Sequence, residues 1–282
     1  MSKDHESATE TAKSRQDAGS RSFPWASVPS LFRAGNEALP FPWEERFGPL
    51  RRLGPDGLMV IGQLGQSLDG RIATPTGHSH YINGPAGIEH LHRIRALVDV
   101  VLVGAGTAVA DDPQLTVRRV EGPHPARAVL DPNGRLPATA RMFADDGVRR
   151  LVLTAGDKTA PVEGVEMIAL QRTNGQIEPA TILAALAERG FKRILIEGGA
   201  DTVSRFIAAK CLDRLHVVVA PMILGSGRTG ISLPPIQTCD EALRVPMHVH
   251  QLGDEVLYDC DLSANTLGSQ RMPSGGFANK SR

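Results

Sequence analysis

The sequence predicts an α/β fold with a mostly parallel central sheet, flanked by helices on both faces, and a C-terminal antiparallel hairpin. From residue 57 onward, apolar runs of strand length alternate with segments of helical period. The runs are rich in β-branched residues and are apolar throughout, as expected of strands buried on both faces. The stretch 247–262 instead alternates in and out around Gly253-Asp254, a pattern typical of a hairpin.

Each element follows from local signals. The expected strands are 58–64, 98–104, 127–131, 149–155, 192–199 and 214–221, and the expected helices are 85–98, 178–189 and 200–210. Pro85 lies at the start of the first helix, where its missing N–H costs nothing. Gly190 ends the second helix, and the third follows a glycine turn. Because strands alternate with helices, most strands should pair in parallel.

The 282 residues divide into four segments. Residues 1–21 and 264–282 are polar, and we expect both tails to be disordered. Residues 22–56 hold half of the twelve aromatic residues, including two Phe-Pro-Trp triplets, and six prolines that argue against long helices. We expect this extension to be a strap whose aromatic side chains pack on the main body; a lid or partner-docking segment is the alternative. Residues 57–263 form the α/β domain.

Charge and cysteine content exclude several classes of protein. Lys and Arg number 31, as do Asp and Glu, so the net charge of zero argues against a nucleic-acid or polybasic membrane-surface binder. No apolar run is long enough to span a membrane, and the N-terminus has no signal-peptide core. The three cysteines are far apart, which suits a cytoplasmic protein.

Glu197-Gly198-Gly199-Ala200 joins a predicted strand to a helix. Paired glycines let the backbone approach a ligand closely, and a helix N-terminus suits a phosphate. A carboxylate at the end of a buried strand is costly unless it is partnered or used. A plain turn is the alternative interpretation.

A second glycine turn follows the strand 98–104. It imitates a dinucleotide-binding fingerprint, but position 109 is Val where the third glycine should stand. Asp111-Asp112-Pro113 interrupts any helix here, so we expect 107–118 to be a substrate-side loop, with a solvated loop as the alternative.

The histidines and the first turn carry less information. His78, His80, His90 and His92 have no Cys or carboxylate at a helpful spacing, so we predict no metal site and solvated histidines. On a helix, His90 and His92 would point apart. Asp69-Gly70 marks a tight turn.

Taken together, these segments resemble the reductase domain of the bacterial riboflavin-biosynthesis deaminase-reductase. The matching stretches are SLDGRIAT (67–74), GHSHYI (77–82), LHRIRALVDVVLVGAGTAVADDPQLTVR (91–118), VLD (129–131), ILIEGGA (194–200) and AAKCLDRLHVVVAPMILGSG (208–227). The resemblance implies a dihydrofolate-reductase-like fold, a homodimer and an NADPH-dependent reduction of 5-amino-6-(5-phosphoribosylamino)uracil to the ribitylamino compound.

The resemblance also implies roles for individual residues. Asp111 would be catalytic, polarising the opening sugar or relaying a proton. The substrate would contact Ser79, Arg95, Leu115, Arg118 and Glu197, the two arginines gripping its phosphate. The cofactor would contact Gly65, Tyr81, Thr107, Asp111, Gly199, Ala200, Asp201, Thr202, Val203, Ser204 and Arg205.

Three features depart from the family pattern. The deaminase half is replaced by the Phe-Pro-Trp segment, so a separate deaminase would be needed. Pro132 stands where bacterial members often carry Ser, and Tyr81 stands where they carry Trp. A same-fold reductase of a pterin or another ribosylamine therefore remains open, as does a non-catalytic nucleotide-binding protein. The residues alone indicate a phosphate-bearing ligand near two glycine turns and do not distinguish NADPH from NADH.

Overall fold

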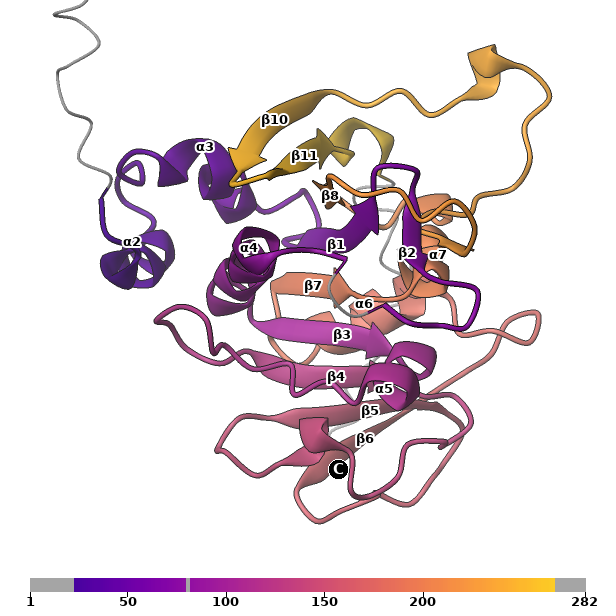
Figure 1. The fold of residues 1–282 in the computed structure, drawn as a ribbon. Helices are drawn as coiled ribbons and strands as arrows, with labels where there is room; N and C mark the ends of the chain where they lie inside the picture. Colours follow the sequence, from indigo (N-terminus) through magenta and orange to yellow (C-terminus); the bar gives the residue numbers. More distant parts are fainter. Residues whose placement is uncertain (1–22, 80–81, 267–282) are drawn as a thin grey trace, which may run out of the picture.

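The computed structural model describes residues 23–79 and 82–266, and within them nine strands form one sheet (Figure 1). Across the sheet the strands are β10 (Met247–Leu252), β11 (Glu255–Asp261), β8 (Arg214–Ala220), β1 (Met59–Ser67), β7 (Arg193–Glu197), β3 (Val100–Gly104), β4 (Ala126–Leu130), β5 (Arg150–Ala155) and β6 (Val165–Leu170). All pairs from β8 to β6 are parallel, and β11 is antiparallel to both β8 and β10. The predicted fold class is confirmed.

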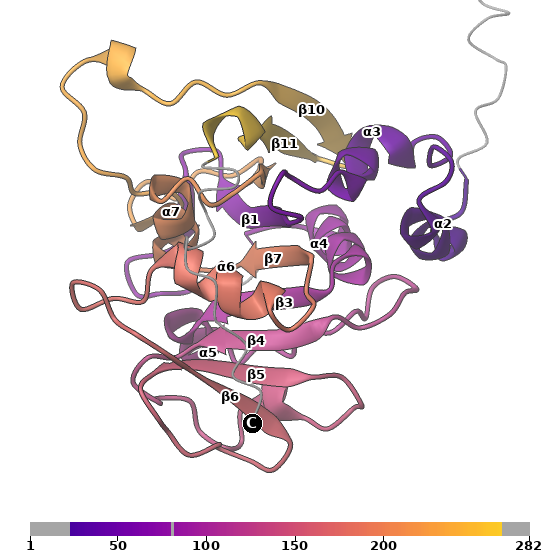
Figure 2. The ribbon, with the colours of Figure 1, turned by 180° about the vertical axis from the view of Figure 1, so that it is seen from behind.

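Helices cover both faces of the sheet (Figures 1 and 2). On one face lie α4 (Pro85–Leu97) and α5 (Ala105–Asp111), and on the other lie α6 (Pro179–Ala187) and α7 (Ala200–Ala208). Alternate strand residues serve the two cores: Val101 and Val103 face α4, whereas Val100 and Leu102 face α6 and α7. This alternation is the period-two geometry of a strand buried on both faces.

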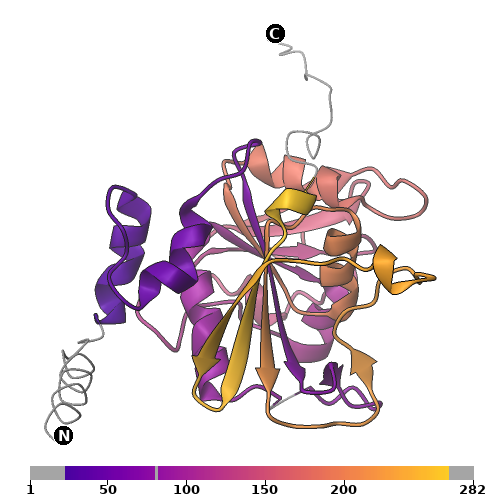
Figure 3. The same ribbon diagram turned by 90° about the horizontal axis from the view of Figure 1, so that it is seen from above.

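The extension packs beside α4, where its indigo helices lie at one end of the sheet (Figure 3). It comprises η1 (Trp25–Ser27), α2 (Val28–Ala34), α3 (Trp43–Phe47) and η2 (Gly48–Arg51), all short, as its prolines predict. The side chains of Trp25, Phe32, Trp43 and Phe47 are buried in the α4-side core. The expectation that every aromatic packs inward is wrong for Phe23 and Phe41, which are 37% and 60% exposed.

The structure corrects several predicted elements. Residues 105–111 form helix α5 where we expected a loop, because Pro113 and the left-handed Asp112 (φ 39°) end the helix after Asp111 rather than preventing it. Strand β6 and the two-stranded sheet of β2 (Arg71–Ala73) and β9 (Arg228–Thr229) were not predicted. Three further single turns are η3 (Arg141–Phe143), η4 (Cys239–Glu241) and η5 (Ser263–Asn265). Among the described residues, no helix combines the length and apolar character needed to cross a bilayer.

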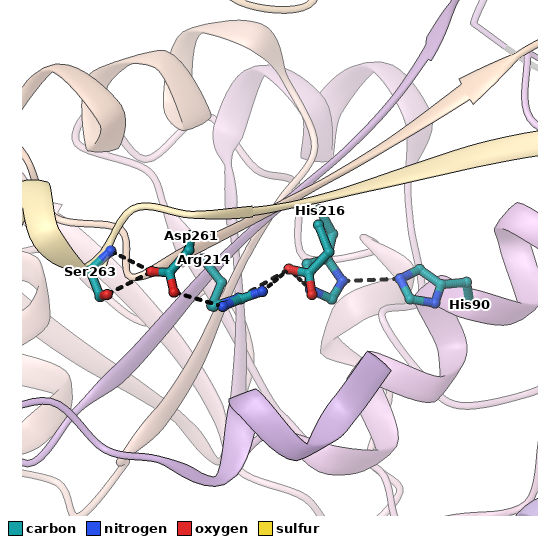
Figure 4. Close-up of polar contacts among 6 residues, drawn as sticks. His90, Arg214, His216, Asp261 and Ser263 are labelled. Atoms are coloured by element: carbon teal, nitrogen blue, oxygen red, sulfur yellow. Dashed lines mark hydrogen bonds and ion pairs between the residues drawn. The ribbon is translucent and has the colours of Figure 1, made fainter. Parts of the chain in front are cut away.

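A chain of polar side chains runs through the interior from α4 to β8 and β11 (Figure 4). His90 Nε2 lies 3.0 Å from His216 Nδ1, and His216 Nε2 lies 3.0 Å from Asp259 Oδ1. Arg214 Nε also donates to Asp259 Oδ1 at 3.0 Å, and its Nη1 donates to Asp261 at 3.1 Å. We call His90, His216, Asp259 and Arg214 the interior network.

The prediction of solvated histidines is therefore wrong for His90 and His92, which are 0% and 3% exposed. They do point apart: His90 reaches His216, and His92 Nδ1 accepts the Arg118 backbone N–H at 2.9 Å. Burial, followed by the charge of His216, holds the pKa of His90 well below its ordinary value.

Candidate active site

The carboxyl ends of two neighbouring parallel strands, β7 and β3, meet at one edge of the sheet. The Gly199 N–H, just past β7, donates to Thr107 Oγ1 at 2.9 Å, in the first turn of the helix that follows β3. A Cβ at Gly198 (φ 87°) would lie 2.8 Å from Thr107 Cγ2, and one at Gly199 would lie 2.7 Å from Thr107 Oγ1. Both glycines are therefore required by the close approach of the two turns.

Two cavities open at this edge, of about 370 Å³ and about 910 Å³. We call them the smaller and the larger cavity. They share the lining residues Ile72, Gly106, Thr107, Gly199 and Arg228. A Cβ added at Gly106 would have no atom within 4 Å, so the space beside this residue is open where the cavities join. The two cavities thus form one elongated site at the carboxyl edge, where open α/β sheets bind ligands.

Glu197, the last residue of β7, lines the smaller cavity and is held from behind by Arg95 of α4. Arg95 Nε donates to Glu197 Oε2 at 2.9 Å, Arg95 Nη2 contacts Oε1, and Arg95 Nη1 donates to Thr116 O at 3.0 Å. Both charged side chains are buried. Because its guanidinium is occupied in this way, Arg95 does not suit the phosphate-gripping role that we expected; it orients Glu197.

Asp111 ends α5 with its side chain exposed toward the smaller cavity. Ser79 Oγ donates to Asp111 Oδ1 at 3.4 Å, a long contact that links two predicted site residues. Leu115 lines the same cavity in a left-handed conformation (φ 57°) with only 1% of its surface exposed. The structure thus brings Ser79, Asp111, Leu115 and Glu197 together.

Arg118 lies three residues beyond Leu115, outside the residues that line the smaller cavity; the residue is exposed, and its Nη1 donates to Thr116 Oγ1 at 2.6 Å. Burial and then the nearby guanidinium groups of Arg95, Arg141 and Arg119 lower the pKa of Arg118 from its ordinary value. Such a concentration of positive charge is favourable for an anionic group. Arg118 remains the better candidate of the two predicted phosphate ligands.

The larger cavity is bordered by the start of α7. Ala200, Asp201, Thr202, Ser204 and Arg205 line it, whereas the Val203 side chain is fully buried in the core beneath α7. Val203 can therefore contact a ligand in this cavity only through its backbone, because the helix turns its side chain toward the sheet. Tyr81 and His80 lie outside the described residues.

Sequence reasoning missed the pair Asn83 and Glu255. Buried Glu255 accepts the Gly87 N–H at 2.7 Å, near the start of α4, and the Asn83 Nδ2–H at 2.8 Å. Asn83 lines the smaller cavity, and a Cβ at Gly65 would lie 1.7 Å from its Oδ1. Gly65, which we expected to contact the cofactor, lines the same cavity, and its missing Cβ makes room for the Asn83 amide.

The larger cavity also holds three arginines that were not predicted, Arg135, Arg172 and Arg228. Arg172 Nη2 donates to Asn133 Oδ1 at 2.6 Å, whereas 56% of the Arg135 side chain is exposed. Within the described residues, no three His, Cys, Asp or Glu side chains gather as metal ligands.

The chain is similar in sequence to a known protein family and to several of its members. Residues 59–258 match the family described as the RibD C-terminal domain. The riboflavin biosynthesis protein RibD of Aquifex aeolicus is 32% identical over 198 residues, 68% of this chain and 54% of that protein. The 2,5-diamino-6-ribosylamino-4(3H)-pyrimidinone 5′-phosphate reductase of Methanothermobacter thermautotrophicus is 30% identical over 214 residues, 71% of this chain and 96% of that protein.

A solved structure agrees with these sequence matches. The deaminase and 5-amino-6-(5-phosphoribosylamino)uracil reductase of Thermotoga maritima superposes with a TM-score of 0.63 at 26% identity, over 78% of this chain and 59% of that one. The chain thus spans little more than half the length of these two bacterial proteins and nearly all of the archaeal reductase. The resemblance noted in the sequence is confirmed, and the chain belongs to the RibD C-terminal domain family.

Proposed function

We propose that the chain reduces a phosphoribosylamino-pyrimidine to its ribitylamino product with NADPH, as part of riboflavin biosynthesis in the cytoplasm. One observation carries the proposal: two cavities join beside Gly106, one lined by Asp111 and Glu197 and the other by the start of α7. A reductase needs such a pair of compartments, because the hydride donor and its acceptor must meet at one point.

The larger cavity fits NADPH. Its volume suits a large ligand, and the first N–H groups of α7 border it as donors for a pyrophosphate. The exposed Arg135 and the nearby Arg172 suit the extra 2′-phosphate. We therefore expect Arg135→Ala to raise the KM for NADPH about tenfold and to leave the KM for NADH unchanged. Equal losses with both cofactors would place the 2′-phosphate elsewhere.

NADPH supplies the hydride when bound, and the protein groups bind, orient and move protons. Asp111, with Ser79 holding its carboxylate, accepts the proton that the amine nitrogen loses as the C1′–O bond breaks and returns it to the ring oxygen, which becomes a hydroxyl. Glu197, fixed by the bidentate Arg95, accepts hydrogen bonds from the substrate. Arg118 attracts the phosphate where the substrate leaves the smaller cavity.

The pyrimidine ring has two candidate forms. The uracil form is the one named for the bacterial structure, and it was our expectation from the sequence. The 2,5-diamino-pyrimidinone form is favoured by the 96% coverage of the archaeal reductase. The buried Gln63 amide in the smaller cavity carries both a donor and an acceptor, so it can pair with either ring.

The decisive experiment is anaerobic incubation of the purified chain and NADPH with each compound, followed by the loss of reduced-nicotinamide absorbance. We expect turnover with at least one of the two. Dihydrofolate and the NADPH-only reaction are the controls. Turnover with dihydrofolate alone would make the chain a pterin reductase, and binding of NADPH without any turnover would favour a nucleotide-binding protein.

We also propose that the chain is a homodimer. Eight large apolar side chains are at least one-third exposed between residues 222 and 249, in the segment that follows β8 and includes part of the edge strand β10: Met222, Ile223, Ile231, Leu233, Ile236, Leu243, Met247 and Val249. A second copy would remove them from water. Sedimentation equilibrium should give a dimer for wild type and for Phe41→Glu, and a monomer for Val249→Glu. A monomeric wild type would contradict the proposal.

A further inference from the structure

We infer that Trp25 positions the loop that carries Arg118, so that the N-terminal extension, residues 23–56, sets how well the substrate phosphate is captured. The Trp25 indole N–H donates to the Glu121 carbonyl at 2.7 Å, across 96 residues of sequence. The inference rests on the proposed function for its kinetic consequence, but the positioning itself can be measured without it.

The Trp25 ring is itself held in place. It packs edge-on to Trp43 and Phe47, with ring centroids 5.3 and 5.4 Å away. The Arg93 guanidinium lies 5.4 Å from its centroid and 4.6 Å from that of Trp43. Only 9% of Trp25 is exposed, so its N–H has a fixed direction toward the loop.

The loop 116–124 is held from two sides. On the α4 side, His92 Nδ1 accepts the Arg118 N–H at 2.9 Å. On the same side, a Cβ at Gly122 would lie 2.6 Å from Ala96 Cβ of α4. On the extension side, Trp25 binds Glu121, and a Cβ at Gly122 would lie 3.5 Å from Pro29. Arg118 is bound at the first anchor and lies three residues from the second, so loss of the second loosens the loop on the C-terminal side of Arg118.

Trp25 and Arg118 border the same open hollow of about 570 Å³, together with Arg119 and Glu121. The family match begins at residue 59, so the extension-side anchor comes from outside the region shared with the family. Arg118 thus lies within the residues that match the family, whereas Trp25 lies outside them.

Trp25→Phe and Trp43→Phe form a matched pair of variants in the full-length chain. Each keeps an aromatic ring and removes one indole N–H, but Trp43 Nε1 donates to Phe23 O within the extension and not to the loop. We expect Trp25→Phe to raise the KM for the phosphorylated substrate about threefold to tenfold at nearly unchanged kcat. Trp43→Phe should leave the KM unchanged.

Amide hydrogen exchange gives a second readout. Exchange at residues 118–121 should be at least about threefold faster in Trp25→Phe than in Trp43→Phe or wild type. This difference, seen in a protein that turns over neither pyrimidine, would support the positioning while the proposed function fails. Equal exchange in both variants, an equal rise in KM in both, or faster exchange with an unchanged KM in an active enzyme would each overturn the inference.

Discussion

Arg95 and Arg214 each hold a buried carboxylate supplied by another element, Glu197 in the first case and Asp259 in the second. The Glu197 carboxylate lines the smaller cavity, so one of its sides remains available to a ligand. The Asp259 carboxylate is fully buried and lies between Arg214 and His216, and neither cavity touches it. Both carboxylates are paired with an arginine, so the ion pair does not distinguish them. What distinguishes them is whether a ligand in a cavity can reach the carboxylate.

The largest expected effect comes from an acid that faces the cavity without a buried partner. Asp111→Asn keeps the shape and removes the charge, so kcat should fall about 10²- to 10⁴-fold with little change in the KM for NADPH. Steady-state kinetics and a melting curve test this, and the melting temperature should not move because Asp111 is exposed. A near-normal kcat would show that Asp111 only ends helix α5 and takes no part in the reaction.

In the interior network we expect the reverse result, a loss of stability without a loss of kcat. Asp259→Ala removes the buried carboxylate that Arg214 and His216 share and leaves Arg214 only the partly exposed Asp261, so the free energy of unfolding should fall by about 3–5 kcal/mol. Its kcat should stay normal in the folded protein. Glu197→Gln is the contrasting variant, because it should lower both stability and kcat. Urea denaturation and steady-state kinetics on both variants test this. A catalytic defect in stably folded Asp259→Ala would contradict the purely structural role of Asp259.

A smaller effect is expected at the exposed arginine. Arg118→Ala should raise the KM for the phosphorylated substrate about 10- to 100-fold and leave kcat nearly unchanged, because ground and transition states share the phosphate contact. The dephosphorylated substrate should show no difference between wild type and variant. A fall in kcat at constant KM would instead move Arg118 into the chemical step.

The smallest effect is a dependence of stability on pH. The pKa of His90 is held well below 6.5 by burial, and burial followed by nearby arginines lowers that of His92 to about 3. Below pH 6.5 these histidines bind protons in the unfolded chain but stay neutral in the folded chain. The free energy of unfolding therefore has its full value above pH 6.5 and decreases as the pH is lowered further. Each histidine contributes up to about 1.4 kcal/mol per pH unit. His90→Gln should remove its share of the slope between pH 6.5 and 5; an unchanged slope would contradict this.

Local signals were sufficient for much of the fold and for the location of the site. The predicted glycine turns after 98–104 and 192–199 do lie at one edge of the sheet, because β3 and β7 are neighbouring parallel strands. The loop expected over 107–118 was half wrong, since Pro113 limits a helix only from its C-terminal side.

Partners distant in the sequence account for most of what was missed. Arg95 and Glu197 are 102 residues apart in the sequence, and His90 and His216 are 126 residues apart. The sequence around Arg95 and around His90 therefore gave no indication of these contacts. Asn83 was missed for the same reason, because its position depends on Glu255. Polar burial is decided by tertiary pairing, which residue type and periodicity do not encode.

The aromatic cluster of the extension has a spectroscopic consequence. Both tryptophans of the chain, Trp25 and Trp43, lie in it, and neither belongs to the sheet. Tryptophan emission therefore reports whether the extension is docked, whereas far-ultraviolet circular dichroism reports the strands and helices of the α/β domain. If the two signals change at different denaturant concentrations, the extension undocks before the sheet unfolds; coincident curves mean that strap and sheet melt as one unit.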